Sequence, residues 1–332
     1  MPSDAISDLV AVLGPQIIET RRFFHGIPEL GFEENQTAQA IADRLKAAGL
    51  EVETGIGKTG LVGVLKGAKP GPRLMIRADI DGLPVNELTG LEFASTNGRM
   101  HACGHDGHIT MAVTAAEILA GMKDQLAGTL IFVFQPAEEI VMGALAMIDD
   151  GLFEKYPADR VIGTHLWNQI PTGTIGVNRA TVFASADQFR LTVHGKGGHG
   201  AMPHTTIDPV VAIAEIITTA QTVVSREVPP NDMGVLTFGQ IHGGSAPNVI
   251  ADSVTVEGTV RAYTAETRVL IMKALERISS NVAAAMRATT SFERIHGAPP
   301  VINNPEVAAW VTKQASLVVG EGNARELEPV SV

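Results

Sequence analysis

Apolar positions in the first half of the chain switch between helical and strand-like spacing. Between Glu33 and Leu50 they recur every three or four residues, with Gly49 where a helix commonly ends, at Ala38, Ile41, Ala42, Leu45 and Ala48. Short apolar runs follow at residues 73–76, 129–134 and 160–164, and a helical stretch covers residues 107–122. Strands that alternate with helices predict an α/β domain with a largely parallel sheet.

A polar cluster directly follows each of the three apolar runs. The clusters are Arg77 to Asp81, Gln135 to Glu139 and His165 to Asn168. Ligands of open α/β sheets bind beyond the carboxyl ends of the strands. We therefore expect the three clusters to converge at one edge of the sheet.

The order of elements changes between residues 186 and 296. Alternating apolar residues at 189, 191 and 193 indicate a strand, and Asp208-Pro209 then gives a helix an N-cap and a proline in its first turn. Strand-like runs near 234–241 and 253–261, a helix at 265–287 and a last strand complete a βαββαβ order, typical of a ferredoxin-like domain. A helical segment at 305–319 follows, so this domain is expected to be inserted into the first one.

Composition narrows the class of function. A chain of 332 residues with 45% hydrophobic and 18% charged residues is expected to form about two globular domains. The net charge of -11 opposes nonspecific binding to nucleic acid or anionic membranes and favours a small-molecule partner. With no signal-like start and no long apolar span, we expect a cytoplasmic protein. One cysteine, Cys103, excludes an intrachain disulfide.

The densest chemical cluster lies between Met100 and His108. It holds three histidines, a cysteine and an aspartate within nine residues. Thiolate, imidazole and carboxylate groups together are the ligands that transition-metal ions select. Cys103 and His105 flank Gly104, which allows a tight turn that directs both side chains to one ion. A buried, inert thiol is the alternative for Cys103 taken alone.

A second cluster, Glu138-Glu139, follows a strongly apolar strand. Adjacent glutamates are common in solvated loops, but beside a metal one carboxylate can ligate while its neighbour accepts a proton from water. His165, at the next strand end, offers a further ligand. Two other interpretations fail: Gly57-Lys58-Thr59 lacks the first glycine of a phosphate-binding loop, and a cysteine-protease mechanism leaves Asp79 and both glutamates without roles.

Ordered motifs from Phe23 to Asp252 resemble those of the M20 metallopeptidases, within them the branch of hippurate hydrolases, indole-acetyl-amino-acid hydrolases and N-acyl-amino-acid amidohydrolases. The matching stretches are FFHGIPELGFEE, IRADIDGLPV, MHACGHDGHITM, FQPAEE, GTHLWN, GKGGHGAMPH and HGGSAPNVIAD. The resemblance implies a zinc-aminopeptidase-like catalytic domain, residues 1–185 and 297–332, with a ferredoxin-like lid or dimerisation domain inserted at residues 186–296. It also implies two divalent ions (Mn2+, Zn2+ or Co2+) and a homodimer or higher homo-oligomer.

Residue roles follow from the same resemblance. The implied metal ligands are Cys103, His105, Glu139 and His165. Glu138 would be the general base and Asp79 would orient a ligand. In the inserted domain, His199 would reach the partner subunit's site and stabilise the oxyanion, while Asn248 and Arg261 would hold the substrate carboxylate.

One departure from the family affects the expected activity. Members of the family continue past residue 332 through a Glu-Asp-Phe motif to a last histidine that ligates the second ion, and this sequence has neither. The leading hypothesis is hydrolysis of N-acyl-L-amino acids. The alternatives are a catalytically impaired protein that binds a ligand or dimerises, and a dipeptidase or aminopeptidase on the same scaffold.

Overall fold

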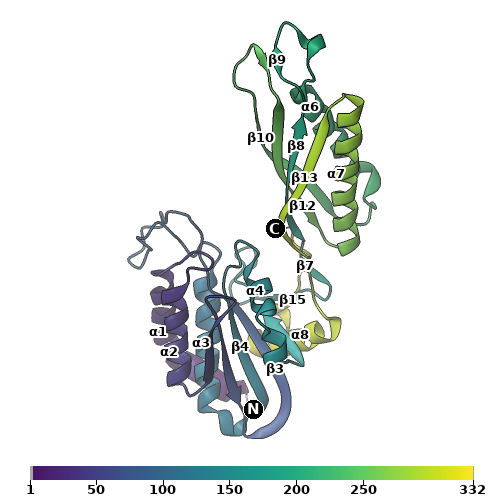
Figure 1. The fold of residues 1–332 in the computed structure, drawn as a ribbon. Coiled ribbons are helices and arrows are strands. Elements are labelled where there is room, and N and C mark those ends of the chain that lie inside the picture. The colour runs from purple at the N-terminus through teal and green to yellow at the C-terminus, as the bar shows by residue number, and fades with distance from the viewer. Residues whose placement is uncertain (1–2, 332) are drawn as a thin grey trace. The chain divides into compact units, whose positions relative to one another are not determined.

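The three apolar runs predicted as strands lie side by side in a five-stranded sheet (Figure 1). The structure is a computed structural model that describes residues 3–331, and it divides into two compact units, one up to Pro171 and one from Thr172 onward. The predicted boundaries at residues 185 and 296 stay a prediction. Within residues 3–331, none of the helices combines the length and the apolar character that a membrane span requires.

The sheet of the first unit has the order β1-β2-β4-β3-β5. Strands β3, β4 and β5 run parallel, as predicted, whereas β1 and β2 add an antiparallel edge. The strands are β1 (Glu51–Ile56), β2 (Gly60–Lys66), β3 (Lys69–Asp79), β4 (Ala127–Gln135) and β5 (Arg160–Gly163). The helices are α1 (Ser3–His25), α2 (Asn35–Ala47), α3 (His105–Gly121), α4 (Gly143–Asp149) and α5 (Leu152–Lys155), with a short 3-10 turn η1 (Lys123–Gln125).

Both faces of this sheet are covered, and strand β4 contributes to both cores because successive side chains on a strand point to opposite faces. Phe132 and Phe134 of β4 pack in a core with α2 and α3, and α1 lies against α3. Ile131 and Val133 point to the opposite core, which includes Met147 of α4. The carboxyl ends of β3, β4 and β5 lie at one edge of the sheet because the three strands run parallel.

The second unit contains the predicted βαββαβ arrangement. Its antiparallel sheet has the order β10-β12-β8-β13, the strand order of a ferredoxin-like domain, and helices α6 and α7 pack on one face. The elements are β8 (Ala186–His194), α6 (Pro209–Thr222), β10 (Gly234–Gly243), β12 (Ser253–Ala262), α7 (Ala265–Ala285) and β13 (Thr289–Ala298). The Asp208 carboxylate caps α6 as expected, accepting hydrogen bonds from the amides of Val210 and Val211.

Smaller elements complete the second unit. Three two-stranded pairs, β9 with β11, β7 with β14, and β6 with β15, accompany the helix α8 (Pro305–Val319). Their bounds are β6 (Ile175–Val177), β7 (Thr181–Phe183), β9 (Gly198–His199), β11 (Val249–Ile250), β14 (Val301–Ile302) and β15 (Ala324–Glu326). The short helical turns are η2 (Pro203–Thr205), the π-helical η3 (Val223–Glu227) and η4 (Glu321–Asn323).

Candidate metal centre and active site

The polar clusters that follow β3, β4 and β5 meet around the imidazole of His105. This residue begins α3, directly after Gly104, whose φ of 87° is the left-handed conformation expected of the tight turn. Three groups of potential ligand atoms each lie within 4.8 Å of one another, and His105 belongs to all three. The groups are Cys103 with His105 and His165, His105 with Glu138 and Glu139, and Asp79 with His105 and His108.

Hydrogen bonds fix which nitrogen of His105 faces the other candidate ligands. Its Nδ1 lies 2.9 Å from the carbonyl oxygen of Asp81 and therefore donates to it. In the neutral ring Nε2 carries the lone pair, and it lies 3.8 Å from Oε1 of Glu139 and 3.9 Å from Oε2 of Glu138. A histidine that donates its second nitrogen to a carbonyl is the usual arrangement at metal sites.

His165 is held in the corresponding way at the end of β5. Its Nδ1 lies 2.6 Å from the carbonyl oxygen of Leu166, which leaves Nε2 facing Sγ of Cys103 at 3.5 Å. An imidazole lone pair beside a thiol is a donor set that transition-metal ions favour.

Two buried atoms in this cluster support cation binding. Nε2 of His105 and Oε1 of Glu139 are buried without a hydrogen-bond partner among the described residues. Unsatisfied buried polar atoms are costly, so an opposed pair of this kind fits a bound cation that both atoms would contact. Cys103, His105, Glu139 and His165 therefore fit a metal site in composition and in placement.

The electrostatics of the cluster point the same way. Burial lowers the pKa of His105, but interactions with Asp81, Cys103 and Asp79 outweigh this effect and raise the pKa to about 11. Burial raises the pKa of Glu139 to about 7 and also raises the pKa of Glu138. The acids around His105 raise its pKa, whereas burial is the main cause of the raised pKa of the two glutamates, with neighbouring carboxylates adding to it. A divalent cation would displace the proton from Nε2 of His105 and favour the ionised form of both acids.

Asp79 connects the cluster to its surroundings. It is 1% exposed and accepts hydrogen bonds from Nη1 of Arg77 at 2.7 Å and from Nδ1 of His108. Burial alone would raise the pKa of Asp79, but the His108 hydrogen bond and the Arg77 charge lower it overall. Asp79 is thus an anion at neutral pH, 3.5 Å from Nε2 of His105.

His108 and Asp81 are part of this arrangement and were not predicted as site residues. Nε2 of His108 accepts a hydrogen bond from the amide of Leu166 at 2.8 Å, so this side chain ties β3 to the segment carrying His165. The Asp81 carboxylate accepts from the amide of Glu139 at 2.9 Å. Spacing carried one available signal, because His105 and His108 are three residues apart and share a helix face.

The remaining predicted residues lie in the second unit. His199 in β9 pairs with Val249 in β11, and the carbonyl of Asn248 accepts from the amide of Gly200, so His199 and Asn248 are neighbours. Nδ1 of His199 accepts from the amide of Ala201 at 3.1 Å, which leaves an N–H on Nε2 when the ring is neutral. Arg261 lies on β12, opposite Val235.

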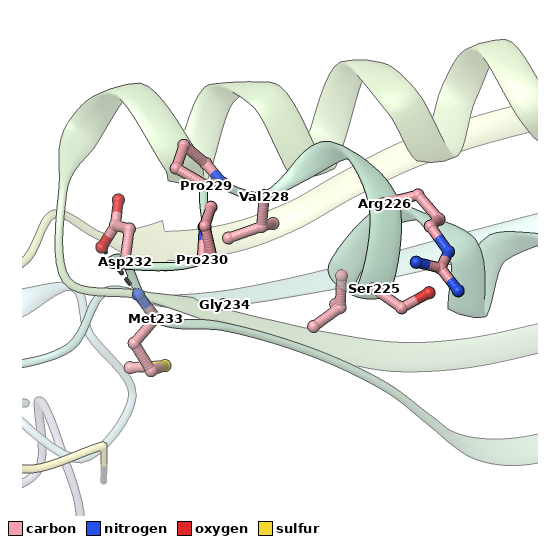
Figure 2. Close-up of a pocket in the computed structure, with 9 residues that line it drawn as sticks. Ser225, Arg226, Val228, Pro229, Pro230, Asp232, Met233 and Gly234 are labelled. Carbon is pink, nitrogen blue, oxygen red and sulfur yellow. Dashed lines mark hydrogen bonds between the residues drawn. The ribbon is translucent and has the colours of Figure 1, made fainter.

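A surface hollow of about 540 Å³ also lies in the second unit, between η3 and the start of β10 (Figure 2). Its acidic residue, Asp232, accepts hydrogen bonds from the amide of Met233 and the hydroxyls of Thr264 and Thr267. The Asp232 carboxylate therefore stabilises the start of α7 through Thr264 and Thr267.

Comparisons with known proteins place the chain in a family. The model of "Peptidase family M20/M25/M40" matches residues 75–331. The chain is 40% identical to an N-acyl-L-amino acid amidohydrolase of Geobacillus stearothermophilus, over 92% of this chain and 83% of that protein. It is 40% identical to the hippurate hydrolase of Campylobacter jejuni, over 91% of this chain and 79% of that protein.

A solved structure agrees with these sequence matches. A dinuclear metal-binding peptidase of the M20 family from Bacillus subtilis superposes with a TM-score of 0.82 and 32% identity, covering 97% of this chain and 83% of that one. The fold, the matched motifs and the named relatives lead to one conclusion: this chain belongs to peptidase family M20/M25/M40 and is an amidohydrolase.

Proposed function

We propose that the protein hydrolyses the amide bond of N-acyl-L-amino acids, hippurate among them, at the cluster around His105. The observation that carries this proposal is the pair of adjacent glutamates beside the lone pair of His105, with Glu139 offering a buried, unpartnered oxygen and Glu138 a second carboxylate. Relatives named for N-acyl-amino-acid and hippurate hydrolysis support the substrate class.

Cys103, His105, Glu139 and His165 would hold divalent ions, two in the complete family site, with Mn2+, Zn2+ and Co2+ as candidates. Such ions supply positive charge that polarises the substrate carbonyl and makes water easier to ionise. Asp79 would keep His105 and His108 in place through the contacts described above.

Glu138 would move the protons of the reaction. Its carboxylate accepts a proton from the attacking water as the water oxygen bonds to the carbonyl carbon. It then gives this proton to the amide nitrogen as the C–N bond breaks, and the products are a carboxylate and a free amino acid. Burial raises the pKa of Glu138, which brings it closer to neutral pH and suits a group that must both accept and donate.

Three residues of the second unit would complete the chemistry. His199 would donate a hydrogen bond from its Nε2–H to the developing oxyanion in the partner subunit's site, and the hydrogen bond at Nδ1 supports that tautomer. Asn248 and Arg261 would bind the substrate carboxylate, a task that suits an amide and a guanidinium fork. We also propose that the protein assembles as a homodimer or higher homo-oligomer.

An assay of the released amino acid tests the proposal. The protein is incubated with Mn2+, Zn2+ or Co2+ and hippurate, N-acetyl amino acids or a dipeptide of matched size. We expect release from the N-acyl substrates, and Glu138→Gln should lower kcat by about 10²–10⁴-fold with the bound metal unchanged. Metal binding without turnover of any N-acyl substrate would refute hydrolysis and favour a binding protein, whereas preference for the dipeptide would favour a peptidase.

A further inference from the structure

The turn that carries Glu138 and Glu139 has an unusual backbone. Ala137, directly before the pair, has a φ of 48°, and Val141, two residues after it, has a φ of 59°. Residues other than glycine rarely adopt this left-handed backbone conformation, and β-branched residues such as valine adopt it least readily. A backbone of this kind persists only where surrounding contacts hold it.

Two buried carboxylates accept hydrogen bonds from the backbone of this turn, one on each side of Glu138. Glu34 accepts a hydrogen bond from the amide of Ala137 at 2.7 Å, and Asp81 accepts one from the amide of Glu139 at 2.9 Å. Both acids are 0% exposed. Glu34 is separated from Ala137 by 103 residues in the sequence, so only the tertiary fold brings the two together.

Glu34 is the N-cap residue of α2, a position where short polar side chains usually cap the helix. It is the residue before α2, yet its carboxylate makes no capping bond. Glu29 caps α2 instead, accepting from the amides of Gln36 and Thr37 at 3.2 and 2.8 Å. Glu34 is thereby free to reach Ala137, while its second oxygen accepts from the hydroxyl of Thr59.

Burying a carboxylate is unfavourable unless the group is well bonded, and burial indeed raises the pKa of Glu34. The Glu34 carboxylate does not bond to α2. It is buried and accepts a hydrogen bond from the amide of Ala137, whose backbone is in the left-handed region. These contacts indicate that Glu34 stabilises the turn rather than the helix. Its other partner, Thr59, lies on the turn between β1 and β2, so Glu34 links that turn to the glutamate pair.

We propose that Glu34 is a positioning residue: its carboxylate holds the amide of Ala137 and thereby sets the direction in which Glu138 and Glu139 point. This inference rests on the proposed function, because it assigns Glu34 a purpose in proton transfer by Glu138. It concerns the PELGFEE segment at residues 28–34, which provides no candidate metal ligand.

The test compares Glu34→Ala, Glu34→Gln and Glu29→Ala. Glu34→Ala should lower kcat by about tenfold to a hundredfold while KM changes little, because the base is misplaced and not removed. Glu34→Gln should restore most of kcat, since its Oε1 can accept from Ala137 and its Nε2 can donate to Thr59. Glu29→Ala is the matched control: it weakens the start of α2 without touching the turn, and kcat should be retained.

Amide hydrogen exchange of the metal-free protein gives a readout besides activity. Glu34→Ala should speed exchange in the peptide covering residues 136–143, and Glu29→Ala should not. Wild-type exchange and kcat in Glu34→Ala would overturn the proposal, as would an equal effect of Glu29→Ala.

If Glu34→Ala does not fold, the variant Thr59→Val still tests the proposal. Thr59→Val removes the donor that orients Glu34 and keeps the side-chain size, so faster exchange in the same peptide is again expected, and unchanged exchange overturns the proposal. If the wild-type protein cleaves no N-acyl amino acid, the proposed function fails, while the exchange experiment still decides whether Glu34 positions the turn.

Discussion

The hydrogen bonds made by their ring nitrogens distinguish the roles of His105 and His108. His105 and His108 are both buried at the start of α3. His108 uses both nitrogens in hydrogen bonds, to Asp79 and to the amide of Leu166, whereas His105 uses only Nδ1. A metal ligand needs a lone pair, which Nε2 of His105 provides once a cation displaces its proton. His105 is therefore suited to ligation and His108 to holding its neighbours in place.

Asp79→Asn tests the positioning role at this centre. The amide keeps the size of the side chain but removes the charge near His105 and weakens the bonds from Arg77 and His108. We expect metal affinity to fall by about 10–100-fold, measured by titration calorimetry. Asp159→Asn is the control, because Asp159 makes an exposed ion pair with Arg73 at the other end of β3. Equal affinity in both variants would show that Asp79 does not act on the ligands.

Sequence reasoning identified the residues at the centre of the site, but it missed the residues that hold them in place. Cys103, His105, Glu138, Glu139 and His165 stand out because their side-chain types and strand-end positions are visible in the chain, although their roles stay predictions. Asp81, His108 and Glu34 act through contacts with residues 24 to 103 positions away. Such contacts depend on tertiary packing, which local spacing does not encode.

Among the elements, those with strong periodicity or clear end signals were predictable. Helix α6 begins at Pro209 after the Asp208 cap, and α2, α3, α7 and α8 lie close to their expected bounds. The long helix α1 was not predicted, and it contains Pro15, a residue that normally argues against a helix interior. Strands β1 and β2 were also missed, because β1 is mostly polar and a glycine interrupts the apolar run of β2.

The cap of α6 allows a test at this scale. Asp208→Ala removes the acceptor for the amides of Val210 and Val211, so the unit should lose about 1 kcal/mol of unfolding free energy. Urea unfolding of the second unit, followed by circular dichroism, measures the loss. Glu215→Ala, an exposed change within the same helix, should have little effect. A loss as large in Glu215→Ala would mean that the cap is not responsible.

At the scale of the whole molecule, metal binding should be coupled to stability. The candidate ligands come from the start of α3 and the residues just before it, the turn after β4 and the segment after β5. An ion bound by them would therefore join three segments of the first unit. At a free metal concentration of 100 times Kd, the unit should gain about 2.7 kcal/mol. Thermal unfolding with Mn2+ or Zn2+ measures the gain, and a chelator should reverse it.

A double control accompanies that measurement. His105→Ala should abolish the gain, because His105 belongs to all three groups of candidate ligands. His204→Ala, which removes an exposed histidine of the second unit, should leave it intact. Stabilisation that survives loss of His105 would place the bound ion elsewhere in the protein.

A mixed dimer tests whether His199 acts at the active site of its own chain or at that of a partner chain. Glu138→Gln and His199→Ala each should be nearly inactive alone, the first through loss of the proposed base and the second through loss of the proposed oxyanion donor. The two variants are co-expressed with different tags, and the mixed dimer is purified. If His199 acts on the partner's site, one of the two sites in that dimer combines an intact Glu138 with an intact His199.

Random pairing places about half of the dimers in the mixed form, so an unfractionated mixture should regain about a quarter of wild-type activity. If His199 acts within its own chain, neither site of the mixed dimer holds both residues and no activity returns. Co-expression of Glu138→Gln with the Glu138→Gln/His199→Ala double variant is the control, because no arrangement of those chains restores a site. Activity in the mixture and none in the control would establish that the homo-oligomer is the catalytic form, since a monomer could not bring the two intact residues together.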